Sequence, residues 1–131
     1  MANPESIFSQ YIKNRMPREV YAWKIMNGMQ NGIPDLYFSG CKSDLWAESK
    51  WVKIPKKETT AIDPGLSALQ TRWLYNRWKE GRNVCVLVGS PIGCVVLQNE
   101  AMFDSIYKHH LCTPKKEIAE WIIQQTHGSL E

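Results

Sequence analysis

Three charged side chains, Asp35, Glu48 and Lys50, have the types and spacing that metal-dependent phosphoryl chemistry requires. Glu48 and Lys50 are two residues apart, so on an extended strand they lie on the same face. Mg²⁺ is often held by one or two carboxylates together with waters and a substrate phosphate. Such an ion activates a bound water, and a neighbouring lysine stabilises the charge that develops on the phosphate. The three residues therefore predict a phosphodiester-hydrolysing site.

Two short strands are needed to bring these residues together. Residues 32–35 (Gly-Ile-Pro-Asp) predict a tight turn, residues 36–38 an apolar strand, residues 39–44 a second turn and residues 45–52 another strand. If the strands are adjacent, Asp35 meets Glu48. The alternative is an ordinary hairpin with a surface aspartate and a Glu–Lys pair, because each short motif is common by itself. The bulky neighbours of Glu48 favour a site, since buried charges are normally paired or bound to a metal.

Four motifs follow one another in a characteristic order. They are G-x-P-D at 32–35, E-x-K at 48–50 after the twelve residues 36–47, Q-x-x-W at 70–73 and G-x-x-V-x-V at 81–86. This order resembles the PD-(D/E)xK nuclease superfamily and, more narrowly, its virus-type replication-repair nuclease (VRR-NUC) domain. The resemblance covers about residues 5 to 97. One departure is Ser49, where the family usually has an apolar residue.

The resemblance implies an α/β fold with a restriction-endonuclease-like core, in which a central mixed β-sheet is flanked by α-helices. The predicted order of helices and strands is consistent with it. The implied activity is that of a Mg²⁺- or Mn²⁺-dependent endodeoxyribonuclease. Metal-binding roles fall on Asp35, Glu48 and the Ser49 carbonyl. The implied catalytic residues are Asp35, Glu48, Lys50, Gln70 and Glu5.

The resemblance also bears on the substrate. Stand-alone phage-type members act as homodimers on branched DNA, including four-way (Holliday) junctions, and a two-fold dimer places two sites symmetrically. No separate recognition domain is visible, which favours recognition of DNA structure over a long specific sequence. Two alternatives remain open: a module that binds nucleic acid without cutting it, and a site-specific restriction-type nuclease.

Length and composition limit the number of domains and the class of protein. The 131 residues predict a single domain, 1–131, with ordinary contents of 44% hydrophobic and 22% charged residues. The net charge of +3 is compatible with nucleic acid without being a strong indication. No uncharged run is long enough to span a membrane, and the polar N-terminus predicts no signal peptide. The four cysteines lack zinc-type spacing, which predicts reduced core thiols in an intracellular protein of the bacterial or host cytoplasm. The absence of G-x-S-x-G and phosphate-loop motifs argues against a serine hydrolase or P-loop NTPase.

The remaining pattern predicts four helices and three further strands. The strands are expected at 19–26, 84–89 and 94–97, and a loop at 27–32. The helices are expected at 4–15, capped by Asn3, at 67–80, ended by Gly81, at 99–108, capped by Asn99, and at 114–126, capped by Thr113. Apolar stripes are expected at residues 7, 8, 11 and 12 of the first helix and at 66, 69, 73 and 74 of the second.

Two predicted site residues also have structural interpretations. Glu5 is either a first-turn acid that interacts with the helix dipole or a residue that approaches the metal. Gln70 either completes the capping box Ser67-x-x-Gln70 or uses its amide to orient the site or contact DNA, and we expect that one side chain cannot do both at once. The basic loop 53–65 is either solvated or a phosphate clamp. His109 and His110 pair with nothing by spacing and are expected at the surface.

Overall fold

A five-stranded mixed sheet forms the centre of the molecule. The computed structural model describes residues 3–26 and 31–130. Its strands lie side by side in chain order, as β1 (Tyr21–Lys24), β2 (Leu36–Ser39), β3 (Asp44–Trp51), β4 (Val84–Ser90) and β5 (Gly93–Leu97). Neighbouring strands are antiparallel except β3 and β4, which are parallel. The first strand is shorter than the predicted 19–26, and part of the predicted loop 27–32 lies outside the described residues.

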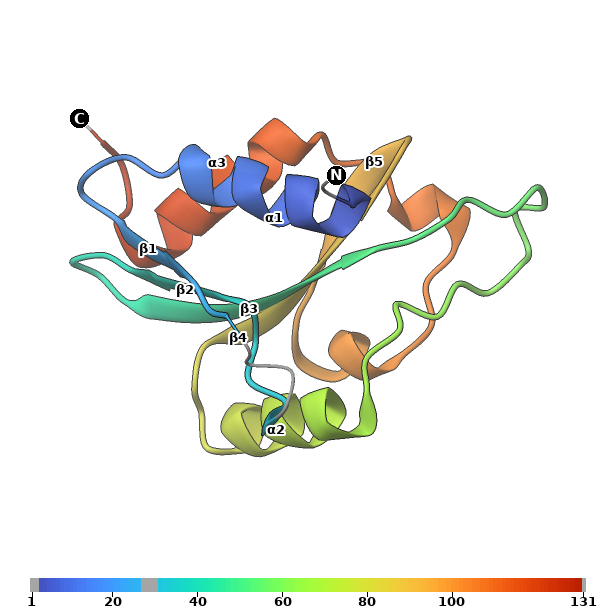
Figure 1. Ribbon diagram of the computed structural model, residues 1–131, viewed down its shortest axis with the longest axis horizontal. Coiled ribbons are helices and arrows are strands. Elements are labelled where there is room, and N and C mark those ends of the chain that lie inside the picture. Colours follow the sequence, from blue (N-terminus) through green and yellow to red (C-terminus); the bar gives the residue numbers. More distant parts are fainter. Residues whose placement is uncertain (1–2, 27–30, 131) are drawn as a thin grey trace.

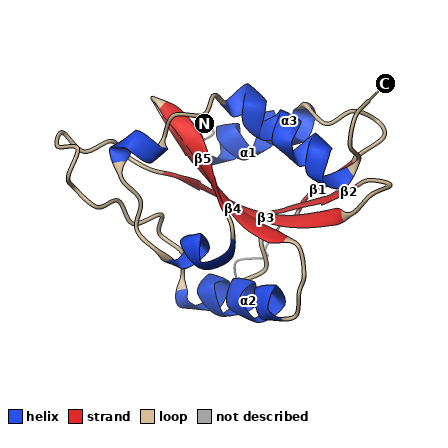
Figure 2. Cartoon of the chain, turned by 180° about the vertical axis from the view of Figure 1, so that it is seen from behind, coloured by secondary structure: helices blue, strands red, loops and turns tan. Residues whose placement is uncertain are grey.

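Helices cover both faces of the sheet. Figures 1 and 2 show α1 (Pro4–Asn14) and α3 (Lys115–Thr126) together on one face and α2 (Ala68–Lys79) on the other. Parallel strands need a crossover connection, and α2 lies in the one that joins β3 to β4. The predicted caps of the first two helices are confirmed, because Asn3 accepts a bond from the Ser6 amide and Ser67 accepts one from the Gln70 amide.

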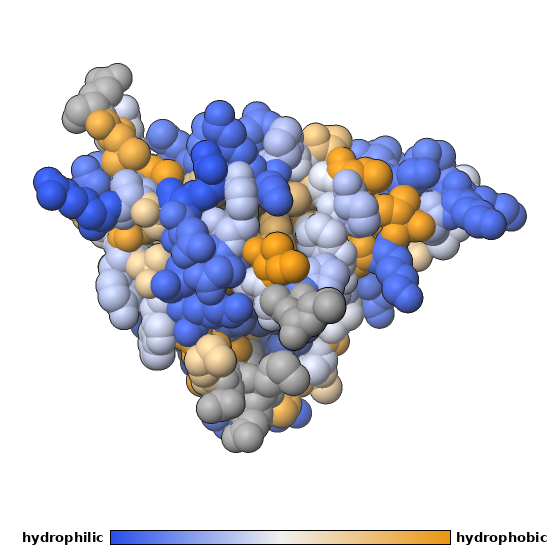
Figure 3. Space-filling view, turned by 45° about the horizontal axis from the view of Figure 1, so that its top comes forward, coloured by the Kyte–Doolittle hydropathy of each residue, from blue (hydrophilic) through white to orange (hydrophobic). Residues whose placement is uncertain are grey.

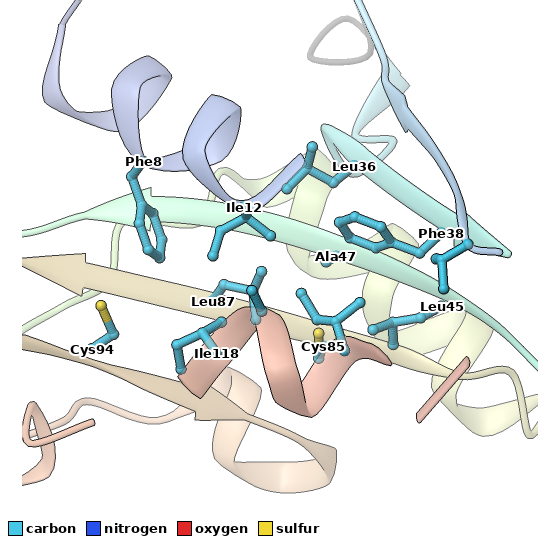
Figure 4. Packing of buried hydrophobic residues seen from close by; sticks show 13 residues of the cluster. Phe8, Ile12, Leu36, Phe38, Leu45, Ala47, Cys85, Leu87, Cys94 and Ile118 are labelled. Atoms are coloured by element: carbon cyan, nitrogen blue, oxygen red, sulfur yellow. The ribbon is translucent and has the colours of Figure 1, made fainter. Parts of the chain in front are cut away.

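The sheet separates two hydrophobic clusters. Figure 4 shows the cluster under α1 and α3, where Phe8 and Ile12 of α1 meet Leu45 and Ala47 of β3. The cluster on the α2 face includes Val52 and has Trp46 packed against it. Alternate residues of β3 therefore enter opposite layers, as predicted. Because Glu48 is in step with Trp46, its side chain is directed towards α2.

The predicted helix at 99–108 is wrong. Two short 3₁₀ segments, η2 (Asn99–Phe103) and η3 (Lys108–His110), replace it. Between them Ile106 pairs with Ile62 through two backbone hydrogen bonds of 2.7 and 2.9 Å, which a continuous helix would not allow. Asn99 does not cap a helix, because its side chain accepts a hydrogen bond from the Trp78 indole nitrogen (3.0 Å).

Expectations about one helix cap, two residues of apolar stripes and two cysteines also need correction. Thr113 pairs with Cys94 in an isolated bridge, so α3 begins at Lys115 with no side-chain cap. Ile7 and Leu69 were expected in apolar stripes, but their side chains are 54% and 44% exposed. Cys85 and Cys94 are free buried thiols as predicted, whereas the other two cysteines, Cys41 and Cys112, are exposed.

Residues 53–61 form an arm that projects from the body of the protein where β3 ends (Figure 1). Its far end is tied down by the Ile62–Ile106 pairing and by an ion pair between Glu58 and Lys108 (3.8 Å). Figure 3 shows this projection as a hydrophilic tip of the surface. Among residues 3–26 and 31–130, no helix combines the length and the apolar character needed to cross a membrane.

Candidate active site

The site lies in a notch where β2 begins beside β3. The ladder between these strands starts with the pair Leu36–Ala47. Extending the same register would set Ser49 opposite Pro34, whose nitrogen carries no hydrogen. The Ser49 amide instead donates to a carboxylate oxygen of Asp35 (2.7 Å), and the Ser49 hydroxyl donates to the other oxygen. Proline therefore ends the ladder, and the aspartate beside it occupies the place of the missing strand.

Glu48 lies next to Asp35 and is almost completely buried, with 4% of its surface exposed. Its Oε1 accepts a hydrogen bond from the backbone amide of Asp35 (3.2 Å). Its Oε2 accepts one from the Gln70 side chain (3.0 Å) and lies 3.5 Å from the Lys50 ammonium. The structure thus brings together Asp35, Glu48 and Lys50, as the strand pairing predicted, and α2 adds Gln70, which the family resemblance implied.

Gln70 completes a helix cap and contacts Glu48 at the same time. Its Oε1 accepts a hydrogen bond from the Ser67 backbone amide (2.9 Å), which completes the capping box. Its Nε2 donates to Glu48 at the same time. The expectation that one side chain could not do both is therefore wrong, because the oxygen and the nitrogen of the amide serve different partners. The cap fixes the orientation of the group that holds Glu48.

Gly32 permits the close contact between the turn and α2. Its φ is +75°, and a Cβ at this position would lie 2.3 Å from the backbone oxygen of Leu69 and 2.9 Å from the nitrogen of Gln70. Only glycine combines that backbone conformation with the absence of a side chain. The G-x-P-D turn, β3 and the first turn of α2 therefore meet at one point, and the sequence motif gave no indication of this contact.

The electrostatics of the notch show an excess of negative charge. Burial, followed by the nearby Asp35 carboxylate, raises the pKa of Glu48 to about 8, although the Lys50 ammonium acts in the opposite direction. Burial also raises the pKa of Asp35, although the two hydrogen bonds from Ser49 favour its ionised form. The buried Glu48 carboxyl and the half-buried Asp35 carboxyl thus lie together with one ammonium, that of Lys50, which contacts Glu48. A bound cation would relieve the repulsion between the two carboxyl groups.

Glu5 lies at the periphery of this group. It is half-buried in the first turn of α1, and its charge contributes to the raised pKa values of both Asp35 and Glu48. The described part of the chain holds no cluster of three or more His, Cys, Asp or Glu residues arranged to bind a metal. Glu5 is therefore close enough to act through its charge, but it does not join the other two in a preformed set of donors.

The residues of the notch fit a hard divalent cation. Asp35 and Glu48 offer carboxylate oxygens, the ligands that Mg²⁺ prefers. The N–H and C=O of a strand residue point to the same side, so the Ser49 carbonyl is directed to the edge where its amide meets Asp35. The Ser49 side chain, a departure from the motif, also has a role, because its hydroxyl binds Asp35. Sequence reasoning missed that contact.

Comparison with known proteins identifies the fold. The mixed sheet with helices on both faces is the restriction-endonuclease-like α/β fold that the sequence predicted. The chain is similar in structure to Hjc of Archaeoglobus fulgidus, a Holliday junction resolvase from an archaeal hyperthermophile. The two share 14% sequence identity and a TM-score of 0.56, over 88% of this chain and 98% of that one. No family model and no curated protein matches the chain.

Proposed function

We propose that the protein is a Mg²⁺- or Mn²⁺-dependent DNA endonuclease of the PD-(D/E)xK superfamily, with the motif order of a VRR-NUC domain. The observation that carries the proposal is the notch itself. The half-buried Asp35 and the buried Glu48 are joined by a hydrogen bond from the Asp35 amide to the Glu48 carboxyl group. The side chains of Lys50 and Gln70 also contact Glu48. The motif order and the likeness of the fold to a junction resolvase support it.

Each residue has a distinct role in this proposal. Asp35, Glu48 and the Ser49 carbonyl would hold the ion, which supplies an activated water and neutralises charge at the phosphate. The Lys50 ammonium stabilises the negative charge that develops during hydrolysis. Gln70 keeps the Glu48 carboxylate in place through its capping box. Glu5 adds negative charge at the edge of the site, which strengthens attraction for a cation.

The proposed substrate is branched DNA, with four-way junctions first. Support comes from the description of the structurally similar Hjc protein as a Holliday junction resolvase. A junction offers two equivalent strands for cleavage, so a homodimer with two-fold symmetry suits it. We place this activity inside the cell, in phage replication or DNA repair.

The direct test is cleavage of four-way junction, flap and linear duplex DNA with matched sequences, in Mg²⁺, Mn²⁺, Ca²⁺ or EDTA. We expect Mg²⁺ and Mn²⁺ to support cleavage, and the junction to be cut faster than the linear duplex. Asp35→Asn should bind the junction without cutting it, and Lys42→Ala, at an exposed turn at the other end of β3, should behave as wild type. Junction binding without cleavage in either metal would indicate a non-cutting module. Preferential cutting of linear DNA at a fixed sequence would indicate a restriction-type enzyme.

A further inference from the structure

A cavity of about 290 Å³ lies on the opposite side of β3 from the notch. Trp51, the residue directly after the E-x-K motif, forms one wall, and the turn between β4 and β5 forms another. Lys115, the first residue of α3, completes the lining. In Figure 1 the β4–β5 turn lies close to the beginning of α1, the helix that carries Glu5. The cavity and the acidic notch therefore belong to the same end of the sheet.

Trp51 is held in place by the core while part of its ring remains accessible. Its ring packs against Phe8 of α1, with centroids 5.9 Å apart. It also lies against Gly89, where an added Cβ would be 2.9 Å from the Trp51 ring and 3.1 Å from the Phe8 ring. The residue is nevertheless only half-buried. A fixed aromatic surface with an accessible part loses little conformational freedom when a second ring stacks on it.

The β4–β5 turn and Lys115 supply the rest of the lining, which is of mixed polarity. Pro91 and the 53%-exposed Ile92 supply apolar surface. The Ser90 hydroxyl is already used within the turn, because it donates to the Gly93 carbonyl and accepts from the amides of residues 92 and 93. The exposed Lys115 provides the positive charge, and its ammonium lies over the Tyr11 ring, 4.4 Å from the ring centroid. This combination of an aromatic wall, an apolar wall and one cation matches a nucleobase attached to its phosphate.

The distance to the notch is short. Ser49 and Trp51 lie on the same face of β3, about 7 Å apart along the strand. The cavity reaches across β4 to β5, and each strand adds about 4.8 Å. A phosphodiester in the notch therefore leaves a flanking nucleotide of the same strand within reach of the Trp51 ring.

We propose that this cavity binds one unpaired nucleobase of the DNA substrate, which stacks on Trp51 while Lys115 contacts a phosphate. The proposal rests on the nuclease function and makes it more specific: the substrate must offer an unstacked nucleotide beside the scissile phosphate, as a branch point does and a continuous duplex does not. Trp51 is thus a specificity-determining residue, separate from the residues that hold the metal.

The test is a series of four-way junctions in which a single abasic nucleotide is moved stepwise across the branch point. Binding is measured in Ca²⁺, so that affinity is separated from cleavage. In the wild-type protein one abasic position should weaken binding by roughly 5- to 150-fold, the range for loss of one base–aromatic stack. In Trp51→Ala the intact junction should bind more weakly and that same position should have no further effect.

Two additional variants guard against a folding defect. Ile92→Glu changes an exposed residue of the cavity wall and places a negative charge where the nucleotide enters, so it should also abolish the position-specific effect. Trp23→Ala removes a 46%-exposed tryptophan from the edge strand β1 and should keep the wild-type profile. The proposal that the cavity binds a nucleobase would be overturned if no abasic position weakened binding of the wild-type protein, or if the sensitive position remained in Trp51→Ala and Ile92→Glu. The nuclease proposal would still stand. A wild-type protein that neither binds nor cuts any branched DNA would overturn both.

Discussion

Replacing Glu48 by glutamine is expected to remove most of the pH dependence of stability in the metal-free protein. The pKa of this buried carboxyl group is raised from 4.5 to about 8. The folded state therefore holds the proton more tightly than the unfolded state. The stabilising effect is complete below pH 4.5 and is lost as the pH rises to about 8, because ionisation then leaves a poorly solvated charge in the notch.

The size of this effect follows from the pKa. Each pH unit by which folding displaces a pKa corresponds to about 1.4 kcal/mol, so the change at Glu48 amounts to at most about 5 kcal/mol. Glutamine does not ionise, so it adds no pH-dependent contribution to stability. It cannot, however, accept both of the hydrogen bonds that Glu48 receives from the Asp35 amide and Gln70. This mismatch costs about 1–3 kcal/mol at every pH. The variant should therefore be less stable than wild type at pH 5 and more stable at pH 9.

Urea unfolding between pH 5 and pH 9 in EDTA measures the free energy of unfolding of both proteins. The curves of stability against pH for wild type and Glu48→Gln should cross within this range. Glu120→Gln, an exposed change in α3, serves as the control and should follow the wild-type curve. Saturating Mn²⁺ should stabilise the wild-type protein above pH 7 and have little effect on Glu48→Gln, because ligand bound to the folded state adds to its stability. Parallel curves for wild type and Glu48→Gln would refute the reasoning about the notch.

Four other substitutions test the remaining contacts. Lys50→Ala should slow single-turnover junction cleavage by ~100-fold or more with little change in affinity, whereas normal cleavage with much weaker binding would make Lys50 a positioning residue. Gln70→Glu keeps the capping oxygen but places a third carboxylate against Glu48, so metal-free stability above pH 8 should fall by about 2–3 kcal/mol. Ser67→Ala removes only the cap and should lower the free energy of unfolding by about 1 kcal/mol with near-normal cleavage. If Gln70→Glu and Ser67→Ala had equal effects on both stability and cleavage, the Gln70 side-chain oxygen and nitrogen would not have separate roles. Gly32→Ala should lower stability by at least about 2 kcal/mol in thermal unfolding, since its Cβ would collide with α2.

The strand pairing and the meeting of Asp35 with Glu48 were predictable from the sequence because both depend on local rules. A proline-containing turn, a period-2 strand and an E-x-K spacing define which side chains share a face. The part that failed depends on contacts between distant segments. The predicted helix at 99–108 is interrupted because Ile106 pairs with Ile62, more than forty positions earlier in the chain. Local propensity contains no information about that partner.

Gln70 shows a different kind of limit. The sequence presented capping and site roles as competing, because it identifies a side chain without showing where its two polar atoms point. In the structure the oxygen faces Ser67 and the nitrogen faces Glu48. Likewise, the turn was sufficient to explain Gly32 of the G-x-P-D motif in the sequence. Its close contact with α2 is seen only in the folded structure. The types of the candidate residues were predictable, whereas their mutual contacts were not.

The contact of Gly32 with α2 has a consequence for the order of events during synthesis. The turn and β3 leave the ribosome before the residues of α2 do, so the nascent chain carries both carboxylates before Gln70 can hold Glu48 in position. The proposed nuclease activity should therefore arise late, when α2 docks, and an incomplete chain should not cut DNA. Refolding from urea offers the check: cleavage activity should not precede the native tryptophan fluorescence signal, and earlier activity would show that α2 is dispensable.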